Sequence, residues 1–156
     1  MMKTAMMAAP RVRDVMTADL VFLRTDLTLD DAWAVLHERG ISGAPVLDVR
    51  GRLVGVLSKA DLADPRHRPP AGPGTVEAAV THVAYAVRAS DPVMSAVRLM
   101  LDHDIHRALV VDDDGTLAGI ITPLDVLRAL AGGVALVEHA DAPVEFVDLR
   151  GLAVRA

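Results

Sequence analysis

GRLVGVLSKADL, residues 51–62, returns 64 positions later as GTLAGIITPLDV, residues 115–126. The same offset aligns residues 12–62 with residues 76–126 without a gap. Both glycines and the Asp of the quoted stretch recur, and Ser58 meets Thr122, which keeps the hydroxyl. Two unrelated segments would not preserve backbone and polar positions at one offset, so we interpret the chain as an internal duplication.

Each copy contains the pattern of an amphipathic helix followed by a hairpin. Four apolar residues of the first copy have the i, i+3, i+4, i+7 spacing of one buried face: Leu29, Ala32, Trp33 and Leu36, after Thr28. Their second-copy counterparts are Val93, Ala96, Val97 and Met100, with Asp91 as the expected N-cap and Pro92 in the first turn.

The predicted hairpins join residues 44–49 to 53–58 around Arg50-Gly51, and residues 108–111 to 117–122 around 112–115. A second helix follows each hairpin, from about Lys59 and about Pro123, and the latter ends at Gly132-Gly133. Short strands are expected at residues 12–16, 21–23 and 84–87.

These patterns divide the chain into a flexible N-terminus (1–10), a first repeat (11–64), a linker (65–74), a second repeat (75–133) and a C-terminal extension (134–156). Prolines and glycines in the linker disfavour regular structure, and its Arg-His-Arg cluster fits a solvated loop. In the extension, Val144, Phe146 and Leu149 suggest a short strand, with Phe146 covering apolar surface. The extension can pack on its own pair, on a partner subunit or on an effector.

Composition narrows the functional classes. The 156 residues include no cysteine, which excludes disulfides and thiolate chemistry and fits a cytoplasmic location. The net charge of -5 disfavours nucleic acid as a partner. No apolar run approaches the ~20 residues of a membrane span, so no membrane contact is expected, and the N-terminus has no targeting pattern.

The repeated motifs resemble one known family. Residues 40–48 and 51–62, their counterparts 105–112 and 115–126, and the opening Val12-Arg-Asp-Val-Met-Thr17 are similar to the cystathionine-beta-synthase-type (CBS) repeat. The resemblance implies an α+β fold, in which two β-α-β-β-α repeats pair around a pseudo-twofold axis. It also implies a non-catalytic, regulatory role and two clefts for AMP, ADP, ATP or S-adenosylmethionine, with no required cofactor.

The predicted ligand-binding residues lie at equivalent places in the two copies. They are Thr17, Ile41, Ser42, Gly43, Ala44, Pro45, Ser58, Asp61, Thr81, Ile105, His106, Arg107, Ala108, Thr122 and Asp125. A Ser or Thr three residues before an Asp can present a hydroxyl, and the carboxylate can accept both hydroxyls of a ribose. The same spacing is also the capping box of a helix N-terminus, and the two interpretations are compatible.

His106-Arg107 marks the largest difference between the copies, since Ser42-Gly43 occupies the equivalent place. The pair resembles that of the gamma subunits of AMP-activated protein kinase, where such residues approach phosphates, and a guanidinium suits phosphate. It can serve a ligand held by either copy. The first cleft lacks a positive charge of its own, so it either prefers a nucleoside or stays empty.

Other kinds of site have weaker patterns. The cluster Asp102, His103, Asp104 and His106 falls on a predicted turn, and the acidic run 112–115 does not match an EF-hand. No catalytic motif is present, and we interpret three histidines as surface residues: His37, His82 and His139.

Two hypotheses therefore remain. The first is a sensor whose adenosine ligand changes the packing of the repeats and thereby an unidentified effector protein. The second is a scaffold with vestigial clefts. In both, apolar helix faces left over after pairing predict a homodimer.

Overall fold

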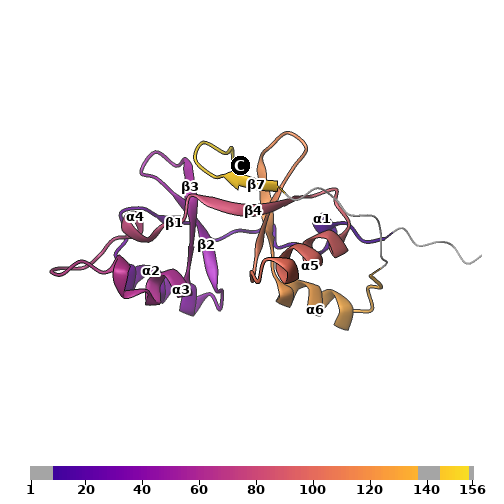
Figure 1. Cartoon of the computed structure of the whole chain (residues 1–156), viewed down its shortest axis with the longest axis horizontal. Helices are drawn as coiled ribbons and strands as arrows, with labels where there is room; N and C mark the ends of the chain where they lie inside the picture. Colours follow the sequence, from indigo (N-terminus) through magenta and orange to yellow (C-terminus); the bar gives the residue numbers. More distant parts are fainter. Residues whose placement is uncertain (1–8, 137–144, 155–156) are drawn as a thin grey trace, which may run out of the picture.

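The computed structural model describes residues 9–136 and 145–154. Two small sheets, of strand order β1-β2-β3 and β6-β5-β4-β7, form the two halves of the molecule (Figure 1). The elements are α1 (Val12–Val15), β1 (Leu23–Arg24), α2 (Leu29–Glu38), β2 (Gly43–Leu47), β3 (Leu53–Ser58), α3 (Lys59–Ala63), the 3-10 helix η1 (Pro65–His67), α4 (Val76–Ala79), β4 (Val83–Arg88), α5 (Val93–Asp102), β5 (Ala108–Val111), β6 (Leu117–Ile121), α6 (Pro123–Ala131) and β7 (Glu145–Asp148).

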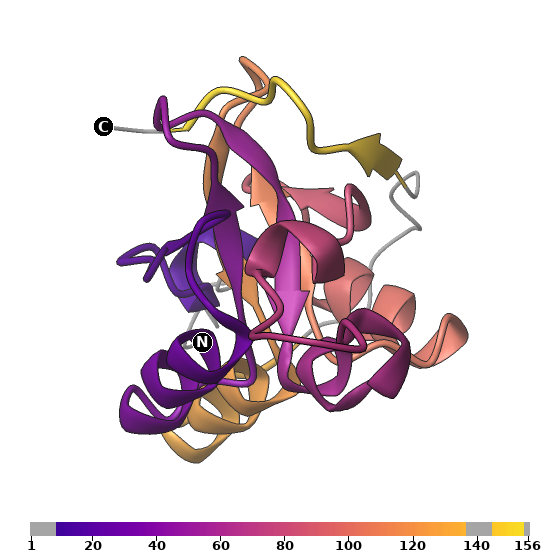
Figure 2. The ribbon, with the colours of Figure 1, turned by 90° about the vertical axis from the view of Figure 1, so that its left-hand side faces the viewer.

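Both predicted hairpins are confirmed, and with them the α+β tandem fold. Gly43 pairs with Ser58 in the first antiparallel hairpin, and Ala108 pairs with Ile121 in the second. β1 and β4 each lie parallel to the first strand of their hairpin. Helices α2, α3, α5 and α6 lie along the same side of the two sheets, as the two views of Figures 1 and 2 show.

The leading segment of each repeat, residues 11–17 and 75–81, packs on the opposite repeat. The amide and carbonyl of Thr17 exchange hydrogen bonds of 2.9 and 3.0 Å with Ile120, and those of Thr81 exchange two of 2.9 Å with Val56. These contacts are related by the 64-residue offset, as a pseudo-twofold arrangement requires. The repeats are therefore intertwined and do not form two separate bodies.

The prediction of a strand at residues 12–16 was wrong, because this segment forms helix α1. The Asp14 carboxylate accepts a hydrogen bond from the Arg11 amide and caps the turn. Val12 is fully buried against apolar residues of the second repeat. Docking on the opposite repeat thus decides the local conformation.

A cluster of apolar residues joins the two sheets. It contains residues of β3, β4, β5 and β6 together with Leu149 of the extension, which is 0% exposed. β7 pairs with β4, which confirms the predicted strand in the extension for residues 145–148. The Gly151 amide donates to the Leu53 carbonyl and Ala153 accepts from the Leu117 amide, so the extension contacts both hairpins. Val144 and the N-terminus up to residue 8 lie outside the described residues, as does the side chain of Phe146.

Three smaller predictions need correction. Trp33 was predicted on the buried face of α2, but it is 45% exposed, because that face consists of Leu29, Ala32 and Leu36. Lys59 Nζ lies 5.6 Å from the centroid of the Trp33 ring. Asp91 is not the N-cap of α5, since Pro92 holds that position and the Asp91 carboxylate accepts from the Arg88 amide. The linker contains one regular turn, η1, which Asp64 caps.

Candidate functional site

Ser58 and Asp61, which are predicted to line the first cleft, lie where β3 passes into α3. The Asp61 carboxylate accepts hydrogen bonds through Oδ2 from the Ser58 amide (2.8 Å) and the Ser58 hydroxyl (2.6 Å). Ser58 Oγ in turn accepts from the Asp61 amide at 3.2 Å. The capping box is therefore formed. Asp61 remains half-buried, with Oδ1 outside the box.

The second cleft repeats this box with one additional contact. Asp125 Oδ2 accepts from the Thr122 amide (2.8 Å) and hydroxyl (3.0 Å), and Asp125 Oδ1 accepts from the Thr17 hydroxyl at 3.0 Å. Asp125 is only 8% exposed. Both predicted capping boxes are confirmed, but the two aspartates differ in how many of their oxygens are engaged.

Arg107 lies across the boundary between the repeats. Its Nη2 donates to Ser42 Oγ of the first repeat at 3.0 Å. A Cβ at position 43 would lie 2.8 Å from Arg107 Cζ, so only the missing side chain of Gly43 leaves room for the guanidinium. Burial lowers the pKa of Arg107 from its ordinary value, while the charge of Asp61 acts in the opposite direction. The guanidinium is thus partly desolvated, while the negative charge of Asp61 favours its protonated form.

This placement corrects the expectation that the first cleft has no positive charge. Positions 43 and 107 are equivalent under the 64-residue offset and face each other where the repeats meet. The second repeat therefore supplies a cation beside Ser42 and Gly43, which carry no charge of their own. Sequence alone left open which copy Arg107 serves, because the contact joins residues 65 positions apart.

The remaining predicted site residues surround these groups. Ala44, Pro45 and Ala108 are buried strand residues, Ile41 and Ile105 are half-buried at the helix exits, and His106 and Thr81 are exposed. Thr81 lies beside Val56 through its backbone, as Thr17 does beside Ile120. His37 and His82 are exposed as predicted, and His139 lies outside the described residues.

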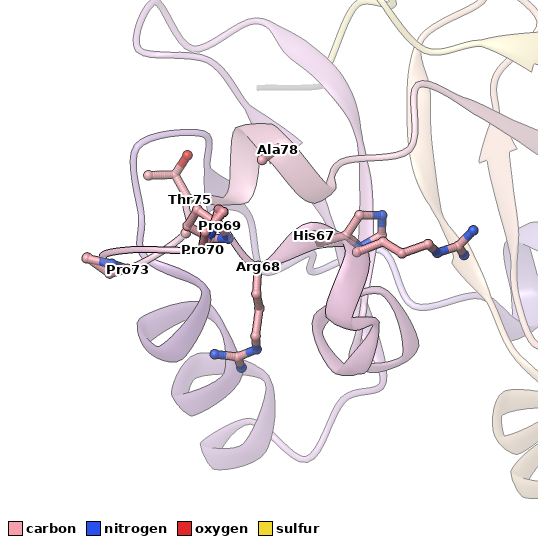
Figure 3. Close-up of a pocket in the computed structure, with 9 residues that line it drawn as sticks. His67, Arg68, Pro69, Pro70, Pro73, Thr75 and Ala78 are labelled. Carbon is pink, nitrogen blue, oxygen red and sulfur yellow. The ribbon is translucent and has the colours of Figure 1, made fainter.

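Two shallow surface depressions lie elsewhere. One of about 450 Å³ is lined mainly by the linker (Figure 3). Arg68 of this lining forms an ion pair of 3.5 Å with Asp30 of α2. Another of about 480 Å³ has a lining that includes Asp26, Asp48 and His82. Neither is lined by a residue of the predicted ligand set, so the two clefts stay a prediction that rests on side-chain chemistry.

The described ranges, 9–136 and 145–154, contain neither a metal-binding cluster nor a membrane-spanning helix. Within them no group of three or more His, Cys, Asp or Glu side chains is arranged to hold a metal ion. The helices in the same ranges are too short or too polar to cross a bilayer.

Curated relatives share the repeat pair but are longer proteins. The chain is 33% identical over 120 residues to an A-adding tRNA nucleotidyltransferase of Aquifex aeolicus, covering 77% of this chain and 14% of that one. It is 34% identical over 142 residues to the magnesium transporter MgtE of Thermus thermophilus, covering 86% and 30%. The chain thus spans well under half the length of these relatives.

Solved structures match over nearly their full length. CBSX2 from Arabidopsis thaliana is 31% identical with a TM-score of 0.65, covering 80% of this chain and 96% of that one. A structure of CBSX2 in complex with AMP is 34% identical, also with a TM-score of 0.65, covering 78% and 96%. A CBS domain pair of protein MJ0100, at 24% identity and a TM-score of 0.68 over 81% and 99%, shares the fold. The CBS domain family matches residues 12–66 and again 76–132, and the chain belongs to that family as a tandem pair.

Proposed function

We propose that this chain is a regulatory module, without catalysis of its own, that binds an adenine nucleotide between its repeats and transmits this occupancy to a partner protein. The observation that supports the proposal most directly is the contact of Arg107 with Ser42 and Gly43 across the boundary between the repeats, in the repeat that carries Asp61. A carboxylate can accept from the two ribose hydroxyls, and a guanidinium can donate to phosphate. A nucleoside phosphate presents both of these groups.

AMP is the first ligand to test, because the CBSX2 structure that is 34% identical to this chain is a complex with AMP. ADP and ATP share its adenosine and carry more phosphate, while S-adenosylmethionine shares the adenosine without phosphate. The comparison among the four separates recognition of the nucleoside from recognition of the phosphate.

Nucleotide binding can be coupled to a partner protein because the two ligand-binding groups come from different repeats. Asp61 belongs to the first repeat and Arg107 to the second. A ligand that contacts both favours the packing arrangement in which they are close together. Any partner that recognises that arrangement will then respond to the nucleotide, because the two binding events are thermodynamically linked.

A thermal unfolding series with AMP, ADP, ATP, S-adenosylmethionine and GMP tests the proposal. A ligand at 100 times its Kd adds about 2.7 kcal/mol to the free energy of unfolding. For a chain of this size such a gain raises Tm by roughly 5–11 °C. An unchanged Tm with all four adenine compounds overturns the proposal, and an equal shift with GMP overturns its adenine specificity.

A scaffold role is the second candidate, and the exposed apolar helix residues favour it. Helices α2, α5 and α6 share one side of the molecule (Figure 1). The exposed apolar residues on them are Trp33, Leu101, Leu124, Leu127 and Leu130. Leu127 is 59% exposed in the middle of a row of three leucines on α6. Such a face is typical of a protein interface, and we propose a homodimer through it. Light scattering after size exclusion is expected to show a dimer that Leu127→Asp converts to a monomer, whereas a monomeric wild type contradicts the scaffold role.

A further inference from the structure

We infer that the first cleft is the nucleotide site of this chain and that the Thr17–Asp125 hydrogen bond closes the second cleft, so that one nucleotide binds per chain. This inference rests on the proposed function and adds which of the two clefts carries it. Three differences between the clefts support it: the free carboxylate oxygen, the position of the guanidinium, and the contact that connects the repeats.

The first difference concerns the oxygens that could accept a ribose. Asp125 has both oxygens engaged, Oδ2 by Thr122 and Oδ1 by the Thr17 hydroxyl. At Asp61, hydrogen bonds from the described residues reach Oδ2 alone. A ribose at the second cleft competes with the Thr17 hydroxyl for the Oδ1 of a largely buried carboxylate, and a displaced Thr17 hydroxyl loses its hydrogen-bond partner, which is costly. A ribose at the first cleft meets an oxygen that is already available.

The second difference concerns charge. Arg107 donates to Ser42 and lies against Gly43, so its guanidinium belongs to the first cleft. Gly43, the equivalent of Arg107 in the first repeat, has no side chain that could donate a hydrogen bond to the second repeat. Among the described residues, a carboxylate with an available oxygen and a guanidinium from the opposite repeat therefore come together at the first cleft and not at the second.

The third difference is the equivalent pair of threonines. Thr17 and Thr81 make the same backbone contacts with the opposite repeat. Of these two threonines, both within the described ranges, Thr17 alone donates its hydroxyl to an aspartate. One hydroxyl group therefore distinguishes the closed cleft from the open one.

Isothermal titration of the full chain with AMP tests this inference. We expect a stoichiometry of one. Asp61→Asn is expected to weaken binding about tenfold or more, because it removes the charge that strengthens the hydrogen bonds to ribose. Arg107→Gln is expected to weaken AMP more than adenosine. Asp125→Asn is expected to leave the stoichiometry at one, and circular dichroism checks that each variant is folded.

The near-isosteric pair Thr17→Val and Thr81→Val provides the matched comparison. Removing the Thr17 hydroxyl frees Asp125 Oδ1, so a second and weaker AMP site is expected in Thr17→Val and none in Thr81→Val. Two equivalent sites in the wild type, or loss of binding in Asp125→Asn with Asp61→Asn unaffected, overturns the inference and leaves the proposed function intact. No binding of any adenine nucleotide to the wild type overturns the proposed function itself.

Discussion

Gly55→Ala is expected to weaken the docking of one repeat on the other. A Cβ at Gly55 would lie 2.3 Å from the Thr81 carbonyl oxygen and 2.5 Å from Val80 Cγ2. Ordinary contact begins near 3.4 Å, so the leading segment of the second repeat must move by about 1 Å. The closest atom belongs to the backbone, so a change of side-chain rotamer cannot relieve the clash.

The magnitude follows from the contacts that this movement breaks. The amide and carbonyl of Thr81 exchange two hydrogen bonds of 2.9 Å with Val56. Each contributes about 1 kcal/mol, and overpacking costs about 1–3 kcal/mol on its own. The lower entropy of the unfolded chain with Ala returns about 0.4–1 kcal/mol. We therefore expect a net loss of about 2–5 kcal/mol in the free energy of unfolding, equivalent to a Tm lower by roughly 4–20 °C.

Urea unfolding and calorimetry of Gly55→Ala beside Gly132→Ala measure this effect. At Gly132 the nearest atoms to an added Cβ lie at 3.4 and 3.5 Å, and φ is -80°. Gly132→Ala therefore lowers the entropy of the unfolded chain as Gly55→Ala does, but it creates no severe clash in the folded state. Equal stability of the two variants would refute the conclusion that close backbone approach at Gly55 holds the repeats together.

Three further predictions concern the extension, the first cleft and the linker. Leu149→Ala is expected to lower the free energy of unfolding by about 2–5 kcal/mol, since Leu149 is fully buried in the cluster between the sheets. A loss below ~1 kcal/mol, measured by urea unfolding, would show that the extension does not complete this core. Gly43→Ala places a Cβ 2.8 Å from Arg107 Cζ, so AMP affinity measured by titration should fall together with stability, and an unchanged affinity would argue against a role for Arg107 in that cleft. The hydrogen bond from Arg66 holds the pKa of Asp64 at about 2. The charged carboxylate therefore favours the folded state above the ordinary value of ~3.9, and this contribution is lost as the pH falls through about 2; carboxyl carbon NMR that shows a midpoint near ~3.9 would contradict the contact.

Agreement between sequence and structure is best where the interaction is local. The capping boxes at Ser58 and Thr122 join residues three positions apart, and the glycines at positions 51 and 115 adopt the positive φ of a turn. Helix α2 buries the stripe that its spacing predicted, apart from Trp33 at its margin. These features depend on neighbours within a few residues, which the sequence displays directly.

Disagreement appears where a partner distant in the chain decides the conformation. The segment 12–15 is apolar enough for either a strand or a helix, and it becomes a helix where it docks on the second repeat. Nothing in the local pattern around Leu149 reveals that it completes a core between two sheets. Periodicity shows which face of a segment is apolar but not which other segment covers it.

The duplication, the hairpins, the helix caps and the family resemblance follow from the sequence by itself, since each rests on short-range spacing or on comparison of the two copies. Only the tertiary structure shows that the leading segments cross between repeats, that Arg107 lies on the first repeat, and that Thr17 contacts Asp125. The reason is physical: two copies of similar sequence carry nearly the same local information. The side chains that distinguish their clefts act across the boundary where the copies meet, and that boundary exists only after folding.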